Sequence, residues 1–158
     1  MRFSVFLLAS ASLASALPSI PIPSIFTRQD ACSGNKADAG YCTPLTYNDV
    51  TTSSTSITTS DCQSTCSSIL ADAGDWGVDF RGQPAGYIDG MFLSGCKFGI
   101  ARETDSDTSQ FEFDVANQDI VDVIDESIKR FGGSHGGKLS AEGTMTCQGH
   151  TVRWFVGY

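Results

Sequence analysis

The spacing of apolar residues predicts a first helix in the middle of the chain. Between residues 61 and 74, four apolar side chains recur at helical intervals, at Cys62, Cys66, Ile69 and Leu70. Asp61 is a favourable N-cap residue, because its carboxylate can accept a bond from the first free backbone N–H groups. Gly74 is favourable just past a helix, where a positive φ is common. We therefore predict a helix that begins at Asp61 and ends at Gly74.

Four segments after this helix are predicted to be β-strands. They are residues 75–80, 87–93, 96–102 and 111–115. The last of them alternates most strictly, because Phe111, Phe113 and Val115 are separated by Glu112 and Asp114. This alternation predicts a strand with one buried face and one acidic, solvated face.

Residues 119–131 carry the strongest helical pattern. Their apolar stripe consists of Ile120, Val123, Ile124, Ser127, Ile128 and Phe131. Acidic residues lie near the predicted N-terminus and Lys129 and Arg130 near the C-terminus, which complements the helix dipole. Asp119, Asp122, Asp125 and Glu126 are expected on the solvated face, opposite the stripe.

The end of the chain predicts a β-hairpin, with strands at 139–147 and 151–156 around Gln148-Gly149. Two helices among several antiparallel strands indicate an α+β fold. We expect a small disulfide-bonded sandwich, in which an antiparallel sheet has both helices packed on one face.

The N-terminal segment predicts export from the cell. Arg2 precedes an apolar run, and Ala14-Ser15-Ala16 ends it with small residues, as in a secretory signal peptide. The run is shorter than the roughly 20 apolar residues that a membrane-spanning helix needs. We assign residues 1–16 to a signal peptide, 17–31 to a Pro-rich spacer or short propeptide, and 32–158 to the folded domain. Cleavage after Arg28 stays an open alternative.

The charge balance excludes one large class of partner. The chain has 158 residues and a net charge of −8, with 10 basic against 18 acidic side chains. Nucleic-acid binding requires clustered Lys and Arg, so we expect no nucleic-acid partner and no stable insertion into a membrane. A single domain is expected from this length. We expect the secreted protein to be a monomer.

The cysteines are expected to form a disulfide framework. An even number of them occurs in a small exported chain, at Cys32, Cys42, Cys62, Cys66, Cys96 and Cys147. A zinc site is the minor alternative, because the Cys62–Cys66 interval is not the usual ligand spacing. The Ser- and Thr-rich segment 43–60 predicts a solvated loop, which in a secreted chain is a candidate for O-linked sugar.

No catalytic constellation is apparent in the sequence. His135 lies among glycines and His150 in a predicted turn, and no Gly-x-Ser-x-Gly motif occurs. Asp105 and Asp107 lack the glycine and terminal glutamate of a calcium loop, so they are interpreted as part of a polar turn. We predict a non-enzymatic protein without a metal or cofactor.

Aromatic side chains offer a sugar-binding alternative. The candidates for stacking on sugar rings are Trp76, Tyr87, Phe92, Trp154 and Tyr158. The two tryptophans occupy alternating strand positions that more often face the core. Exposed coplanar rings would favour glycan binding, and buried tryptophans would disfavour it.

Several strings in the second half of the chain carry a family resemblance. These are GCKFGIA, FDVANQDIVDVIDESIKRFG, AEGTMTC and the closing VRWFVGY. In this order and spacing they resemble the fungal necrosis-inducing factor family, the homologues of the extracellular protein 2 effector. The resemblance covers residues 42–158, and the positions outside the cysteines that carry it best are Gly99, Asn117, Gln118, Asp119, Gly143 and Trp154.

The resemblance implies a fold and a biological setting. It implies a killer-toxin-like α/β sandwich and a secreted fungal effector that acts on a plant host, without established catalytic residues. Its target would be a host extracellular or surface protein or glycan, and the response would be plant cell death or defence. The alternatives are a killer-toxin-like antimicrobial protein that acts on rival microbes and a glycan-binding module. Cys32 and Cys66 are additional to the four family cysteines, so the resemblance implies a Cys32–Cys66 bridge.

Overall fold

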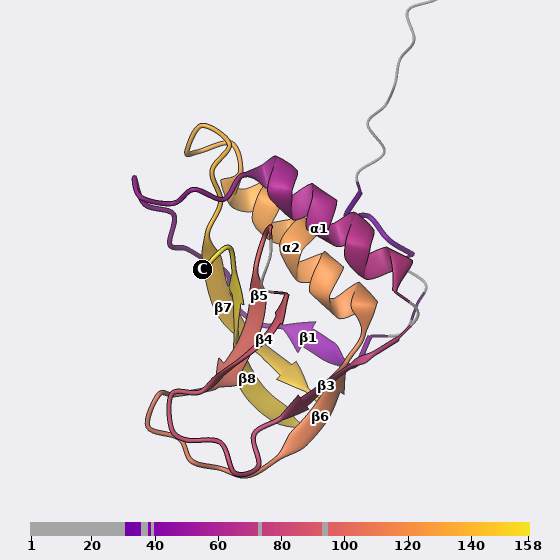
Figure 1. The fold of residues 1–158 in the computed structure, drawn as a ribbon, viewed down its shortest axis with the longest axis vertical. Coiled ribbons are helices and arrows are strands. Elements are labelled where there is room, and N and C mark those ends of the chain that lie inside the picture. The colour runs from indigo at the N-terminus through magenta and orange to yellow at the C-terminus, as the bar shows by residue number, and fades with distance from the viewer. Residues whose placement is uncertain (1–30, 36–37, 39, 73, 93–94) are drawn as a thin grey trace, which may run out of the picture.

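The computed structural model describes residues 31–158 apart from 36–37, 39, 73 and 93–94 (Figure 1). The predicted signal peptide, nearly all of the predicted spacer and the alternative cleavage site at Arg28 lie outside the described residues.

The strands are antiparallel, as predicted, but they form one larger and one smaller sheet rather than a single sheet. The larger sheet has the order β1-β7-β8-β5-β4, and β2 also pairs with β7. Its strands are β1 (Cys42–Pro44), β2 (Asn48–Asp49), β4 (Ile88–Phe92), β5 (Phe98–Arg102), β7 (Ala141–Cys147) and β8 (His150–Val156). The smaller sheet pairs β3 (Trp76–Asp79) with β6 (Glu112–Val115). Both helices lie on the same side of the larger sheet (Figure 1), which confirms the predicted α+β arrangement.

The first helix, α1 (Thr59–Ala71), begins earlier than predicted. Thr58 is the N-cap, and its hydroxyl accepts a bond from the Asp61 N–H at 3.2 Å. The Asp61 carboxylate in turn accepts the Thr58 N–H at 2.8 Å, which completes a capping box. The prediction of Asp61 as N-cap was wrong, because in the Thr-x-x-Asp pattern the threonine is the cap and the aspartate is the third residue of the helix. Gly74 does not have the positive φ of a C-terminal cap, and the helix ends at Ala71 with Asp72 as its C-cap.

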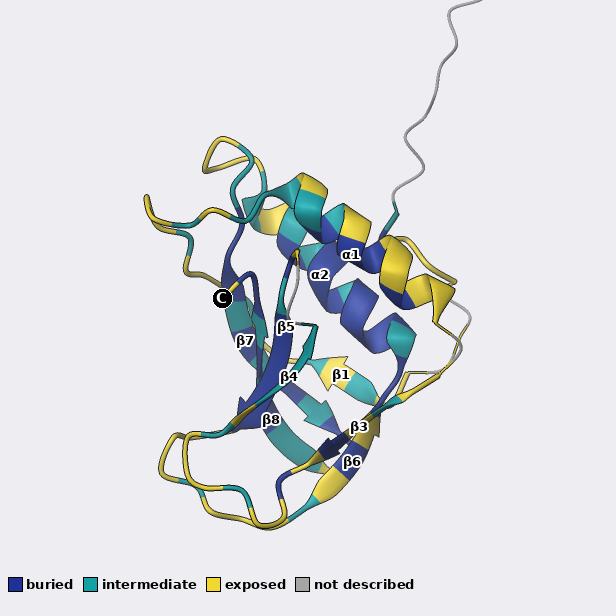
Figure 2. Cartoon of the chain, in the orientation of Figure 1, coloured by how far each residue is buried: buried dark blue, intermediate teal, exposed yellow. Residues whose placement is uncertain are grey.

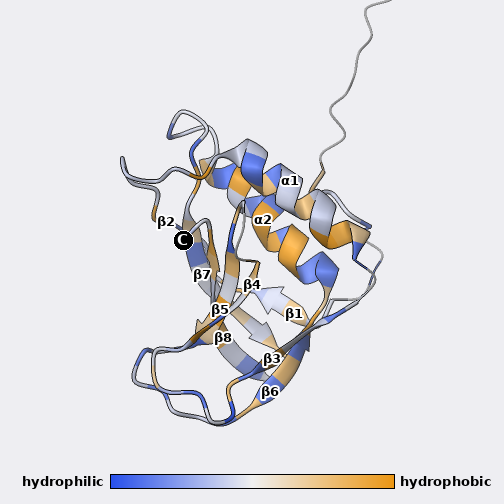
Figure 3. Ribbon diagram, viewed as in Figure 1, coloured by the Kyte–Doolittle hydropathy of each residue, from blue (hydrophilic) through white to orange (hydrophobic). Residues whose placement is uncertain are grey.

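The second helix, α2 (Asn117–Phe131), shows the predicted amphipathic packing. Ile120, Val123 and Ile124 are fully buried, and Figure 3 shows apolar positions along the helix. Two acidic residues differ from the prediction of a solvated face. Asp119 is only 7% exposed and Asp125 only 3% exposed. Hydrogen bonds compensate their burial, because Asp119 accepts the backbone N–H of Tyr41 and Asp125 accepts the Lys129 ammonium at 2.5 Å.

The core lies between the helices and the sheet (Figure 2). Trp154 is completely buried on β8, and its indole N–H donates to the Thr144 carbonyl at 3.2 Å. Directly opposite Trp154 in the β7–β8 pair lies Gly143. A Cβ at Gly143 would overlap both the indole ring and the Thr46 carbonyl oxygen, so the close approach requires glycine here.

The β7–β8 hairpin is confirmed. Its two loop residues, Gln148 and Gly149, have φ of 47° and 90°. Two positive values in succession are typical of the type I′ turn, whose twist matches that of antiparallel strands.

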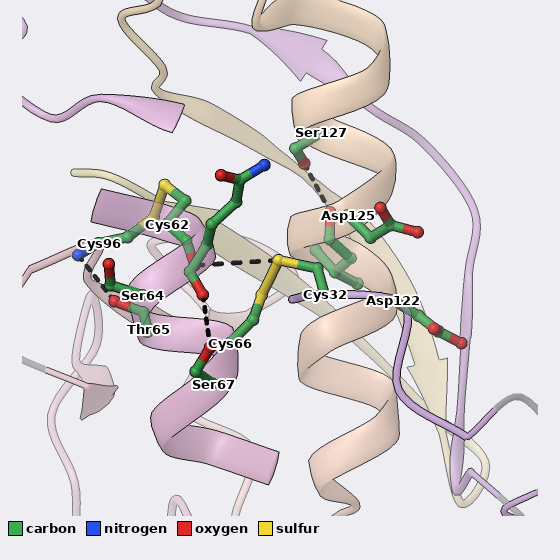
Figure 4. The surroundings of a disulfide bond; sticks show 12 residues. Cys32, Cys62, Ser64, Thr65, Cys66, Ser67, Cys96, Asp122, Asp125 and Ser127 are labelled. Atoms are coloured by element: carbon green, nitrogen blue, oxygen red, sulfur yellow. Dashed lines mark hydrogen bonds between the residues drawn. A yellow bond between two sulfur atoms is a disulfide. The ribbon is translucent and has the colours of Figure 1, made fainter. Parts of the chain in front are cut away.

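Three disulfides bond all six cysteines: Cys32–Cys66, Cys42–Cys147 and Cys62–Cys96. The Cys32–Cys66 pairing implied by the family resemblance is confirmed. Figure 4 shows two of the bridges leaving α1, from Cys62 toward Cys96 and from Cys66 toward Cys32. The third bridge joins two paired strands, because Cys42 and Cys147 are directly opposite in the β1–β7 register.

A buried cation holds the two long connections below the larger sheet. Arg102 at the end of β5 is only 2% exposed, and its guanidinium donates to backbone carbonyls alone among the described residues. The acceptors lie in the 80–87 and 103–111 connections and belong to Phe80, Gln83, Pro84 and Ser109. The guanidinium also lies 4.9 Å from the centre of the Phe80 ring. Nothing in the sequence pattern distinguishes Arg102 from an ordinary surface arginine.

Candidate functional site

A groove of about 410 Å³ lies between the C-terminal end of α1 and the N-terminal end of α2. The helices run antiparallel, so these two ends come together on one side of the molecule (Figure 1). The groove is lined by Asp38, Leu70, Asp72, Gly74, Asp75, Ala116, Asn117 and Gln118. We call it the helix-end groove.

The walls of the helix-end groove combine acidic and apolar groups. Asp38, Asp72 and Asp75 each contribute a carboxylate, and Leu70 is 38% exposed beside them. The Tyr41 hydroxyl donates to Asp75 Oδ2 at 2.8 Å, and this bond raises the pKa of Tyr41 above its ordinary value of 10.0. The predicted first helix placed Leu70 on its buried face, whereas the structure places it in this groove. The arrangement is suited to a partner that brings both a cation and an apolar surface.

Asn117, the first residue of α2, connects two segments that border the groove. Its side-chain oxygen accepts the Trp76 indole N–H at 2.6 Å, and its amide donates to the Asp72 carbonyl at 2.8 Å. These bonds fix the start of β3 and the residue that follows α1. Asn117 was identified from the sequence as a family-motif residue, and its contacts explain an Asn at this position.

Gln118 binds the N-terminal arm, by which we mean residues 31–40 as far as they are described. Its side-chain oxygen accepts the Asn35 N–H at 3.0 Å, and its amide donates to Asp122 Oδ1 at 2.6 Å. Asn35 also donates to Asp38 Oδ1 at 2.7 Å, which positions that carboxylate at the groove. The arm is held a second time by the Cys32–Cys66 disulfide.

Asp119 completes the motif by joining α2 to β1. One carboxylate accepts three backbone N–H groups, from Tyr41 at 2.9 Å, Ala116 at 3.0 Å and Cys42 at 3.3 Å. Burial raises the pKa of Asp119 above its ordinary value of 3.8, and the N–H donors counteract part of that rise. Asn117, Gln118 and Asp119 therefore tie three segments distant in sequence to one helix end.

The remaining family-motif residues lie in the sheet rather than at the groove. Gly99 is on β5, where a Cβ would meet the Ile88 side chain and the Tyr158 ring. Gly143 and Trp154 are the opposed pair on β7 and β8 described above. These three positions are explained by packing, and the structure brings none of them to the helix-end groove.

The residues considered for catalysis are not assembled into a site. His135 Nε2 lies 2.7 Å from Asp49 Oδ2 in a partly exposed pair. His150 stacks on Phe111 with ring centroids 4.4 Å apart, and its neighbour in the strand register, Cys147, is in a disulfide. Among the described residues, no group of three or more His, Cys, Asp or Glu side chains is placed to hold a metal ion.

The polar turn at 104–109 behaves as interpreted from the sequence. Asp107 accepts the Ser109 N–H at 2.8 Å and its hydroxyl at 2.6 Å, which lowers the pKa of Asp107. Asp105 pairs with Arg153. Both carboxylates are therefore engaged by protein groups.

The aromatic side chains do not form a flat exposed platform. Trp154 is fully buried, and Trp76 is half-buried with its ring 4.9 Å from that of Phe92 at an interplanar angle of 56°. Tyr158 is 40% exposed and lies against Phe155 at 57°. These inclinations disfavour the coplanar stacking that a sugar-binding surface uses.

The helix-end groove itself was not found from the sequence. Its carboxylates come from two places in the chain, and nothing in the local pattern brings Asp38 to Asp72 and Asp75. One indication was present, because the Asn-Gln-Asp triplet carries more hydrogen-bonding capacity than a helix start needs.

Comparison with known proteins identifies the family. A search of the curated proteins gives no match. Within the part of the chain that the structure describes, no helix has the length and apolarity to cross a membrane. The family model described as "Pathogen effector; putative necrosis-inducing factor" matches residues 41–147, a span that contains both helices and the strands β1 to β7. This family and the three disulfides point to an extracellular protein. Because the match covers well over half of its length, the chain belongs to this family of pathogen effectors.

Proposed function

We propose that the protein is a secreted, non-enzymatic fungal effector that binds a host extracellular or surface target and triggers plant cell death or defence. The observation that carries the proposal is the family match over residues 41–147. We further propose that the target is bound at the helix-end groove.

The construction of the groove supports a binding role. Three segments distant in sequence are fixed at one helix end by the side chains of Asn117, Gln118 and Asp119. A surface held in this way loses little conformational freedom when a partner docks, so less of the interaction energy is lost to ordering.

The chemistry of the groove indicates the kind of partner. Carboxylates at Asp38, Asp72 and Asp75 surround the exposed edge of Leu70. The complementary surface would present Lys or Arg side chains around an apolar residue. Charge complementarity of this kind accelerates association and selects among partners.

The engagement of the carboxylates supports binding rather than acid–base catalysis. Asp75 accepts the Tyr41 hydroxyl and Asp38 accepts the Asn35 amide. A general acid or base needs its proton to be available to a substrate, whereas these groups already accept bonds from neighbouring side chains.

Infiltration into plant leaves tests the proposed activity. Purified oxidised protein is infiltrated into several plant genotypes beside a reduced and alkylated sample of the same protein. We expect death or defence responses in some genotypes with the oxidised form only, because the disulfides maintain the folded surface. The absence of a response in every genotype would overturn the proposal and direct attention to growth inhibition of microbes and polysaccharide pull-down.

A pair of matched variants tests the location of the binding surface. Leu70 in the groove and Ile88 on β4 are both 38% exposed, so each tolerates a lysine with a similar loss of apolar contact. We expect Leu70→Lys to abolish the leaf response and Ile88→Lys to retain it. If both variants fold and both retain the leaf response, the groove is excluded as the binding surface, whereas the effector activity itself is not contradicted.

A further inference from the structure

A loop rich in hydroxyl groups connects β2 to α1, at the opposite end of that helix from the groove. Residues 50–60 read VTTSSTSITTS and contain no charged side chain. We call residues 52–56 the loop tip. Thr52, Ser53, Ser54 and Ser56 are exposed, and Thr55 is half-buried. The tip is therefore a compact group of accessible hydroxyls on a molecule whose surface is otherwise strongly acidic.

The base of the loop is fixed to the neighbouring chain. Val50 N–H donates to the Ser140 carbonyl at 3.1 Å, and Leu139 N–H donates to the Ile57 carbonyl at 3.0 Å. Within the tip, Thr55 N–H donates to the Thr52 carbonyl at 3.1 Å and closes a turn. The tip therefore projects from an anchored base rather than lying against the core.

The hydroxyls of the loop divide into two groups. Thr51 Oγ1 donates to the Ser140 carbonyl at 3.1 Å and accepts the Ser140 N–H at 2.9 Å. Thr58 Oγ1 donates to Asp61 at 2.7 Å and caps α1. These two hydroxyls hold the fold together. The exposed hydroxyls of Thr52 and Ser54 form a hydrogen bond with each other, within the tip. The hydroxyls of Ser53 and Ser56 make no hydrogen bond among the described residues.

We propose that the loop tip carries O-linked sugars, attached at one or more of Thr52, Ser53, Ser54 and Ser56. Exposed Ser and Thr clusters without charge are typical acceptors for this modification in secreted chains. The donor is a sugar phosphate activated at its anomeric carbon. The side-chain oxygen bonds to that carbon, the bond from carbon to phosphate oxygen breaks, and the hydroxyl proton passes to a base of the transferase. The proposal rests on the secretory route in the proposed function.

The fold limits where the sugar can be tolerated. A glycan on Thr51 would remove the hydrogen bond that this hydroxyl donates to Ser140, and a glycan on Thr58 would crowd the capping box. A glycan on the tip displaces no bond to the rest of the molecule. The tip is also separated from the helix-end groove by the whole of α1, which has 13 residues. At about 1.5 Å per residue, this corresponds to about 20 Å, so a short glycan leaves the groove open.

Mass measurement on secreted protein tests the proposal. The full chain is expressed in a fungal host that attaches hexoses to Ser and Thr, and the intact mass of the secreted protein is recorded. After reduction, cleavage on the amino side of Asp49 and Asp61 releases residues 49–60, which contain the whole tip. We expect this peptide to carry hexose increments, and fragmentation to place them on the tip and not on Thr51 or Thr58.

Two multiple variants complete the experiment. The tip variant combines Thr52→Ala, Ser53→Ala, Ser54→Ala and Ser56→Ala. It leaves Thr55, whose hydroxyl accepts the Thr52 N–H at 3.0 Å. The control combines Ser64→Ala, Ser67→Ala and Ser68→Ala on the exposed face of α1, where each hydroxyl bonds to a carbonyl four residues earlier. We expect the tip variant to lose the increments and the control to retain them.

The outcome is independent of any plant response, so it is distinguishable from a failure of the proposed function. Increments that persist in the tip variant, or that map to Thr51 or Thr58, would overturn the proposal. A wild-type mass equal to that of the unmodified mature chain would also overturn it.

Discussion

The buried carboxylate of Asp119 connects two elements of the fold. It receives N–H groups from Tyr41, Cys42 and Ala116, so it belongs at once to the start of β1 and the start of α2. Its burial and these bonds have opposite effects on its pKa, and the pKa is raised on balance. A proton therefore binds the native protein more tightly than the unfolded chain.

Asp119→Asn is predicted to destabilise the protein in a pH-dependent manner. The amide cannot accept all three N–H groups, which costs about 1–3 kcal/mol when buried donors lose their partners. In the wild type, the contribution of Asp119 to the free energy of unfolding is largest near or below its ordinary pKa of 3.8 and declines as pH rises through the raised value. The difference between wild type and variant, measured by urea unfolding, should therefore narrow with rising pH. A difference that widens would mean that the hydrogen bonds outweigh burial.

Gly143→Ala is predicted to destabilise the sheet by about 1–3 kcal/mol, because an added methyl group overpacks a filled core. The new Cβ would overlap the Thr46 carbonyl oxygen and the Trp154 indole. The Thr46 carbonyl belongs to the backbone between β1 and β2, so it can move only if that segment shifts relative to β7. The control is Gly133→Ala, where nothing lies within 4 Å of the new methyl group. Urea midpoints that are equal for the two variants would contradict the close-packing explanation.

At the residue scale, the sequence indicated which residues are important better than it indicated what each of them contacts. The importance of Asn117, Gln118, Asp119, Gly143 and Trp154 was inferred from the family resemblance. Trp154 faces the core as expected, and Gly143 is explained by its close approach to the Trp154 ring. The burial of Asp119 could not be read from helical periodicity, because periodicity places a residue on a face but does not reveal a chain segment that later covers it.

At the scale of the element, the clearest patterns gave the clearest results. The alternation at 111–115 and the stripe of α2 were both found where predicted, since burial on one face imposes a strict period. The boundaries of α1 were wrong by two or three residues at each end. Its exposed face is rich in serine, so the hydrophobic pattern is weak and the capping residues determine where it begins.

Thr58→Ala tests the capping interpretation. Loss of the hydroxyl removes the acceptor for the Asp61 N–H, and we expect a loss of about 1 kcal/mol in the free energy of unfolding. Ser60→Ala is the matched change two residues further into the helix, at an exposed position whose hydroxyl makes no bond among the described residues. We expect Ser60→Ala to be neutral or slightly stabilising, because alanine has the higher helix propensity. A similar loss in both variants would contradict a specific cap at Thr58.

At the scale of the whole molecule, the disulfides connect elements that packing alone would leave loosely joined. Cys62–Cys96 joins α1 to the segment before β5, and Cys32–Cys66 joins the N-terminal arm to α1. The groove depends on the second bridge, since Asp38 lies on that arm. The sequence could indicate this framework, but it could not indicate that the bridges, together with the Asn-Gln-Asp triplet, create a groove.

A comparison of two cysteine-pair variants separates loop entropy from native contacts. Cys32–Cys66 and Cys62–Cys96 both span 34 residues, so the chain-entropy model gives each the same contribution of about 4 kcal/mol. We expect the double Cys→Ser variant at 62 and 96 to lose more stability in urea unfolding. Cys62–Cys96 joins α1 to the segment before β5, which are two parts of the core, whereas Cys32–Cys66 joins the N-terminal arm to α1. Equal losses would show that loop closure alone accounts for both bridges.

The carbonyl cage around Arg102 holds one end of the molecule through backbone acceptors rather than through a carboxylate. The acceptors of the Arg102 guanidinium in the 80–87 and 103–111 connections are backbone carbonyls, which do not titrate. The opposite end is held by the Asp119 carboxylate, which does titrate. A change in the acidity of the surrounding fluid should therefore loosen or tighten the groove end through Asp119, while the bonds from Arg102 to the lower connections persist. The bonds that hold the two ends thus differ in their dependence on pH. Amide hydrogen exchange at residues 40–42 and 80–87 over a range of pH would measure the stability of each end independently.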